Sequence, residues 1–276
     1  MGNSAEYSDI LYGVDAGVAT ITLNRPDRLN AWCASLDAGV RAAMRAATDD
    51  AAVRVIVLTG AGRGFCAGAD MNVLQGIQGG GATARPAPAE TPWEPSARED
   101  FRKQYSWFPA VPKPIIGAIN GPCAGLGMVI ALYTDIRFAS DAAVFSTAFS
   151  RRGLIAEHGI SWLLPRLVGM ANAADLLFSA RRVEATEAKA LGLVSRVIPH
   201  ADFMAEVQAY ARMLVSEVSP RSLAAMKREI WNAQFSSLGD AIEAANIDMV
   251  ASFASEDFKE GVAHYLEKRP PAFTGK

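Results

Sequence analysis

Two glycine-rich turns, each placed between a short apolar run and a helix-like segment, constrain the fold of this chain most. The first spans residues 59–71 and follows the apolar run 53–58; the second spans residues 120–127 and follows the apolar run 114–119. Apolar runs of this length are typical of strands covered on both faces. A strand, a glycine turn and a helix that recur along one chain predict a layered α/β fold.

The segments before the first turn support this arrangement. Residues 10–14 and 18–23 are rich in strand-forming side chains and flank a short turn, which predicts a hairpin. Apolar side chains then recur at helical spacing between Leu36 and Ala47, so a helix is expected before the strand 53–58. In the second unit we expect a helix over 128–134.

Further strands are expected at 135–139 and 194–198, and the pattern is helical from about Asp202 to the end. Residues 79–97, dense in Gly, Ala and Pro, predict a mobile loop of the kind that often covers a pocket. We therefore expect a core over residues 1–200 and a helical region over 201–276.

Charge and composition narrow the possible functions. The 276 residues carry 27 Lys and Arg against 29 Asp and Glu, without the basic excess of a protein that binds nucleic acid or anionic membranes. The sequence shows no export signal or membrane span, and the three cysteines have no metal-ligand spacing. Reduced thiols and a cytoplasmic location are the simplest interpretation.

The glycine turns also suggest chemistry. A backbone N–H at the start of a helix lacks a partner within that helix and lies at the positive end of the helix dipole, so it can hold an anion. Two such turns can converge on one oxygen and form an oxyanion hole. Each turn alone is equally compatible with a helix that merely packs closely. The segment Gly60–Gly64 matches neither the P-loop nor the glycine motif of dinucleotide-binding proteins.

Four segments resemble the crotonase family, in the family's order. They are N-R-P-D-R-L-N-A at 24–31, G-R-G-F-C-A-G-A-D-M at 62–71, K-P-I-I-G-A-I-N-G-P-C-A-G-L-G at 113–127 and A-L-G-L-V-S-R-V at 190–197. The similarity is clear over residues 8–200 and extends more loosely to 255–261. It implies a crotonase spiral of repeated ββα units with a helical C-terminal region that mediates trimerisation.

The resemblance also implies roles for individual residues. The backbone amides of Ala67 and Leu126 would form the oxyanion hole. The coenzyme A groove would be lined, largely through backbone, by Arg28, Ala31, Ala69, Asp70 and Met71. From the residues alone, Arg28 could equally be a surface cation, and Asp70 a helix cap.

Assembly follows from the same resemblance. Trimers, commonly paired into hexamers, are expected, with the helices near Phe258 and Lys259 reaching the coenzyme A groove of a neighbouring subunit. No separate cofactor is expected, because coenzyme A is part of the substrate.

One departure from the family separates this chain from its hydratases, which use two glutamates. Val129 and Phe149 occupy those positions, and neither side chain can carry a proton. Glu157, at the place where dienoyl-CoA isomerases and some dehalogenases of the family keep a catalytic aspartate, is the preferred acid/base. A solvated loop glutamate is the alternative, and His158 is a weaker candidate.

We therefore expect an enoyl-CoA hydratase/isomerase type of enzyme that acts on an acyl-CoA thioester through an enolate. One carboxylate can move a proton between carbons, so isomerisation is easier to support than hydration. The alternative is a relic of the family that binds CoA esters, or acts as a scaffold, without turnover.

Overall fold

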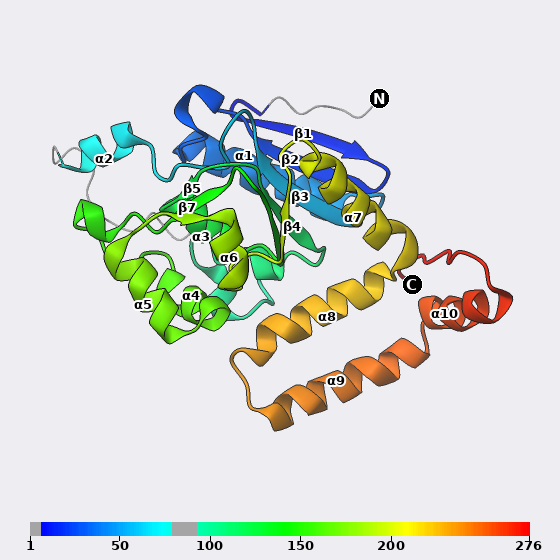
Figure 1. Ribbon diagram of the computed structural model, residues 1–276. Coiled ribbons are helices and arrows are strands. Elements are labelled where there is room, and N and C mark those ends of the chain that lie inside the picture. Colours follow the sequence, from blue (N-terminus) through cyan, green and yellow to red (C-terminus); the bar gives the residue numbers. More distant parts are fainter. Residues whose placement is uncertain (1–6, 79–92) are drawn as a thin grey trace.

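A six-stranded mixed sheet forms the centre of the computed structural model, which describes residues 7–78 and 93–276 (Figure 1). The strand order is β1-β2-β3-β4-β6-β9, and only β1 and β2 pair antiparallel; the other neighbours are parallel. The strands are β1 (Ile10–Asp15), β2 (Val18–Leu23), β3 (Val55–Gly60), β4 (Ile115–Ile119), β6 (Ile136–Ser140) and β9 (Arg196–Ile198). The predicted hairpin and buried strands are confirmed within two residues at each end, and most of the loop expected at 79–97 lies outside the described residues.

The two faces of this sheet are covered by different helices, as the alternation along β3 shows. Ile56 and Leu58 join the cluster that includes the apolar face of α1 (Ala34–Asp49). Val55 and Val57 point the other way and contact the cluster under α7 (Phe203–Glu217). α7, the first helix of the region predicted over 201–276, therefore packs against the sheet.

Both glycine turns lead into helices, as predicted. The first leads from β3 to α2 (Met71–Gln78), and the second leads from β4 to α3 (Leu126–Leu132), which begins two residues earlier than expected. A small second sheet, absent from the sequence prediction, consists of β5 (Cys123–Ala124), β7 (Val144–Ser146) and β8 (Val183–Glu184). Strands this short carry too few side chains to show a period.

Three helices follow the second turn beside this small sheet. They are α4 (Ile160–Val168), α5 (Met170–Ser179) and α6 (Ala185–Ala190). Short 3₁₀ turns occur at Pro26–Arg28, Glu99–Arg102, Phe108–Ala110 and Ser150–Arg152.

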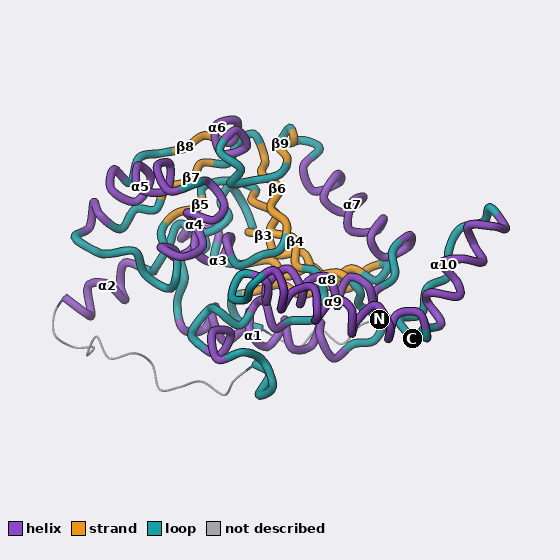
Figure 2. Tube along the Cα trace, turned by 90° about the horizontal axis from the view of Figure 1, so that it is seen from below, coloured by secondary structure: helices purple, strands orange, loops and turns teal. Residues whose placement is uncertain are grey.

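The last three helices extend away from the sheet (Figures 1 and 2). They are α8 (Pro220–Ala233), α9 (Leu238–Phe253) and α10 (Glu256–Glu267). The chain is not helical to its end: residues 268–276 return toward the body, where Arg54 donates to the carbonyl of Phe273 at 2.6 Å. No residue of α9 is buried.

Candidate active site

The two glycine turns lie against each other. Cys66 and Cys123 form a parallel bridge, and the N–H of Ala124 donates to the carbonyl of Cys66 at 2.9 Å. Gly68 has φ +104°, and a Cβ at this position would lie 3.0 Å from the Ala124 oxygen and 3.7 Å from the Leu126 nitrogen. Glycine at 68 therefore lets the first turn approach the start of α3.

The structure corrects the first of the two predicted oxyanion donors. The N–H of Ala67 donates to the carbonyl of Leu29 at 3.0 Å, so the prediction for Ala67 is wrong. Trp32 bonds through its N–H to Gly68 (2.7 Å) and through its carbonyl to Asp70 (2.9 Å). In a parallel bridge of this kind the N–H of Ala69 points to the other side of its segment.

Ala69 and Leu126 therefore supply the amides that remain. Within residues 7–78 and 93–276, neither N–H has a protein acceptor. Leu126 is the first residue of α3, where an N–H has no partner inside the helix. Two unpaired amides on adjoining turns are suited to a single oxygen that becomes negative during a reaction.

Loop 24–32 lies along residues 67–71 and brings the predicted groove residues together. The guanidinium of Arg25 is 2.9 Å from the carboxylate of Asp70 and donates to the carbonyl of Ala31 at 2.5 Å. Arg28 and Met71 are exposed, and Ala31 and Ala69 are half-buried. The sequence pattern did not identify Arg25 as the residue that joins this loop to Asp70, although Arg25 lies within the motif at 24–31.

Asp70 serves as a helix cap. Its carboxylate accepts from the N–H of Asn72 at 3.0 Å, in the first turn of α2. This hydrogen bond and the neighbouring Arg25 lower the pKa of Asp70 below its usual value. The side chain is buried and fully engaged, so the capping interpretation is confirmed.

Phe258 and Lys259 lie on α10, at the opposite end of the molecule from α2 (Figures 1 and 2). Both side chains are exposed. Within one chain they do not join the groove, and a contribution to a neighbouring subunit stays a prediction.

Glu157 occupies a turn before α4. Its side chain is 34% exposed, and burial raises its pKa above the usual value. The ring of His158 is 3.8 Å from this carboxylate, but burial lowers the pKa of His158, which makes it a poor counterion near neutral pH. The hydroxyl of Tyr133 donates to the carbonyl of His158 at 2.9 Å and ties the turn to the end of α3.

An aromatic wall, formed by Trp32, Tyr105 and His158, lies between Ala69 and the turn that carries Glu157. Trp32 pairs with Ala69, and its ring meets that of Tyr105 edge-on at 6.0 Å. Tyr105 meets the ring of His158 edge-on at 4.8 Å. Glu157 is thus next to a wall that begins at one of the two free amides. Trp32 and Tyr105 had no signal in the sequence, because their contact joins distant segments.

Two buried, apolar side chains stand where the sequence resemblance places the two glutamates of the family's hydratases. Val129 is fully buried on α3, three residues after Leu126 and hence on the same face of the helix. Phe149 is 5% exposed. Neither position can exchange a proton.

The described residues hold no group of three or more His, Cys, Asp or Glu that could bind a metal ion. All three cysteines are free. In the same part of the chain, no helix has both the length and the apolar character that are needed to cross a bilayer.

Known proteins are similar to this chain in sequence and in fold. The family model for enoyl-CoA hydratase/isomerase matches residues 13–276. The chain belongs to the enoyl-CoA hydratase/isomerase family. The 1,2-epoxyphenylacetyl-CoA isomerase of Escherichia coli is 35% identical over 267 residues, which are 97% of this chain and 98% of that protein. A probable enoyl-CoA hydratase of Rhodobacter capsulatus is 36% identical over 271 residues, with 98% and 99% covered.

Solved structures of this family have the same fold. An enoyl-CoA hydratase from Polaromonas sp. JS666 superposes with a TM-score of 0.84 at 30% identity and covers 96% of this chain and 99% of its own. An enoyl-CoA hydratase from Bacillus anthracis gives a TM-score of 0.85 at 26% identity, with 98% and 100% covered. The predicted crotonase fold is confirmed.

Proposed function

We propose that this family member converts an acyl-CoA thioester through an enolate whose oxygen accepts hydrogen bonds from Ala69 and Leu126. The two free amides on adjoining turns support this proposal. Each such donor contributes about 2.7–4 kcal/mol of transition-state stabilisation in acyl-transfer enzymes. Glycine at 68 and at 125 lets the two turns lie close together, which keeps the two free amides near each other.

Coenzyme A would lie along loop 24–32 and residues 67–71. The exposed guanidinium of Arg28 is the cation of this loop that is available to a phosphate, because Arg25 is engaged by Asp70. Arg28, Ala31, Ala69 and Met71 thus keep their proposed place in the groove, whereas the carboxylate of Asp70 serves the protein itself.

Proton transfer between substrate carbons is the reaction that the site supports best, with Glu157 as the acid/base. The observation that carries this proposal is the half-buried carboxylate with its raised pKa beside the wall that begins at Ala69. Hydration requires a second proton-carrying group to activate water, and Val129 and Phe149 cannot act as one. The similarity to a protein named as an isomerase agrees with this choice.

Replacing Glu157 tests the proposal. Glu157→Gln is expected to bind acyl-CoA esters with unchanged affinity but to lower deuterium exchange at the substrate carbons by about 10²–10⁴-fold, the usual contribution of a general acid/base. A panel of acyl-CoA esters in D₂O, followed by mass spectrometry, provides the measurement. The matched control is Glu206→Gln, an exposed glutamate on α7, which covers the other face of the sheet.

Two outcomes contradict the proposal in different ways. Full exchange in Glu157→Gln would assign the proton to another group. Binding of CoA esters to the parent protein without exchange, hydration or hydrolysis would instead identify a binding protein that has lost turnover.

A further inference from the structure

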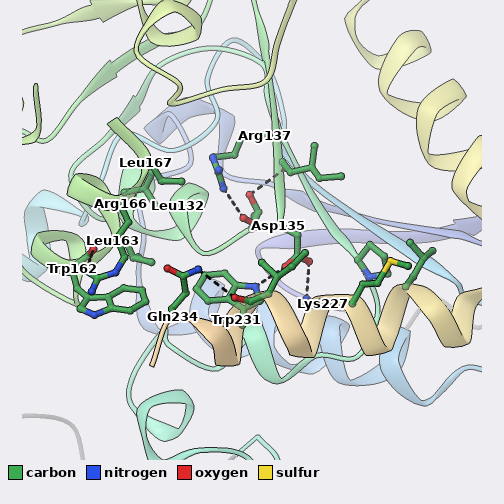
Figure 3. A pocket seen from close by; sticks show the side chains of 16 residues that line it. Leu132, Asp135, Arg137, Trp162, Leu163, Arg166, Leu167, Lys227, Trp231 and Gln234 are labelled. Atoms are coloured by element: carbon green, nitrogen blue, oxygen red, sulfur yellow. Dashed lines mark hydrogen bonds and ion pairs between the residues drawn. The ribbon is translucent and has the colours of Figure 1, made fainter. Parts of the chain in front are cut away.

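A cavity of about 400 Å³ lies between α4 and α8, away from the two glycine turns (Figure 3). Its walls are mainly apolar side chains of these two helices: Trp162, Leu163, Leu167, Met226, Ile230 and Trp231. Cavities of this volume, with apolar walls and a few polar groups, are typical binding sites for small molecules.

The cavity touches α3 only at Leu132, its last residue, whereas the free amide of Leu126 is the first. A seven-residue helix is ~10 Å long. The cavity therefore does not reach the free amide of Leu126.

Two opposite charges that line the cavity, those of Asp135 and Lys227, neutralise each other. The carboxylate of Asp135 is 2.7 Å from the ammonium of Lys227 and accepts from the indole of Trp231 at 3.0 Å (Figure 3). It also accepts from the N–H of Ile115 at 2.7 Å. At close range, the carboxylate of Asp135 is therefore already engaged by Lys227, Trp231 and Ile115.

Two further cations in the cavity lack a counterion. The half-buried guanidinium of Arg137 donates to the carbonyls of Leu193 (2.9 Å) and Thr134 (2.6 Å), and in the described residues no carboxylate lies within ion-pair distance of it. Burial lowers its pKa to about 10, against the attraction of Asp135. Arg166 is exposed: its guanidinium stacks over the ring of Trp162 at 3.8 Å and donates to the Trp162 carbonyl at 3.0 Å, and it too has no carboxylate partner among residues 7–78 and 93–276.

We propose that this cavity binds a hydrophobic monocarboxylate, with its carboxylate at Arg137 and its alkyl or aryl tail against Trp162 and Trp231. Charge complementarity supports this class of ligand, because a half-buried guanidinium without a counterion, in a cavity with mainly apolar walls, favours an anion with an apolar tail. Guanidinium groups also match the planar, two-oxygen geometry of a carboxylate.

Equilibrium binding of dodecanoate and of 4-phenylbutyrate tests the proposal. Dodecan-1-ol serves as the uncharged control, and saturating acetyl-CoA occupies the proposed thioester site throughout. We expect at least one of the two acids to bind, and an acid to bind at least about tenfold more tightly than the alcohol, since a hydrogen bond to a charged group is worth this much or more. Equal affinity for dodecanoate and dodecan-1-ol, or no binding of either acid, would overturn the proposal.

A pair of variants on α8 locates the ligand. Ile230 is exposed at the cavity, so Ile230→Asp places a carboxylate there without disturbing the core, and acid binding should fall at least about tenfold through charge repulsion. Ala233→Asp adds the same charge to an exposed position of α8 that does not line the cavity, and should leave binding unchanged. Acids that bind both variants as tightly as the parent protein occupy another site, which would also overturn the proposal.

Discussion

The surroundings of Glu157 and Asp70 shift the pKa values of these two carboxylates in opposite directions. Asp70 is held by Asn72 and Arg25, and its pKa is lowered. Glu157 is beside a histidine whose own pKa is lowered, and burial raises the pKa of its carboxylate. Of these two carboxyl groups, only that of Glu157 has its pKa shifted toward neutral pH, where a carboxyl group can both donate and accept a proton.

The raised pKa predicts the pH dependence of turnover. A carboxylate base is active when deprotonated, so kcat/KM for proton exchange should be constant at high pH and fall as the pH drops through a pKa above 4.5. Rates from pH 4 to pH 8, with circular dichroism at each pH to exclude unfolding, provide the measurement. His158→Gln should keep this inflection; its disappearance in that variant would assign the titration to the histidine.

At the scale of secondary-structure elements, the site depends on contacts that fix helices to strands. Gly127 is one example: a Cβ there would lie 2.2 Å from the carbonyl of Cys66, so any side chain would push α3 away from the first glycine turn. Lys227 is another. It is buried on α8 and contacts Asp135 and the carbonyl of Lys113, which hold α8 against the segments that precede β6 and β4.

Breaking the Lys227 contact should destabilise the protein. Lys227→Met leaves the Asp135 carboxylate without its cation, and loss of one partner of a buried pair costs about 3–5 kcal/mol of unfolding free energy. Lys227→Met combined with Asp135→Asn should recover part of this loss. Urea unfolding measures both variants. A decrease below about 1 kcal/mol in the single variant, the range of surface pairs, would show that the pair contributes little to stability.

Seen as a whole molecule, the chain leaves a large apolar surface on its C-terminal helices. Exposed side chains of α9 include Leu238, Ile242, Ile247 and Val250. Apolar patches of this kind mark interaction surfaces in stable proteins. This surface agrees with the assembly that the sequence resemblance implies.

Light scattering should therefore give a mass of three or six times the 29.4 kDa chain. Ile247→Glu puts a charge on the apolar surface and should shift the protein toward smaller species, because a buried charge without a partner is costly. Ala205→Glu, which adds the same charge at an exposed position of α7 outside this surface, is the control and should leave the mass unchanged. A parent protein that is monomeric at micromolar concentration would refute the trimer.

The sequence by itself determined the features that depend on near neighbours. The hairpin at residues 10–23, the buried strands and the two glycine turns follow from side-chain period and turn chemistry, which act over a few residues. The fold class followed from the same local patterns together with the family motifs. Leu126 was identified by those motifs alone, since the local pattern placed the start of α3 two residues later.

Tertiary structure alone decided which groups meet. Ala67 and Ala69 are two residues apart and locally similar, and only the hydrogen bond to the carbonyl of Leu29 engages the N–H of Ala67 while that of Ala69 stays free. The wall of Trp32, Tyr105 and His158 likewise joins segments far apart in the chain. Hydrogen-bond partners, ring contacts and cavities form between such distant segments, whereas the periodicity of a sequence reports only on the segment that carries it.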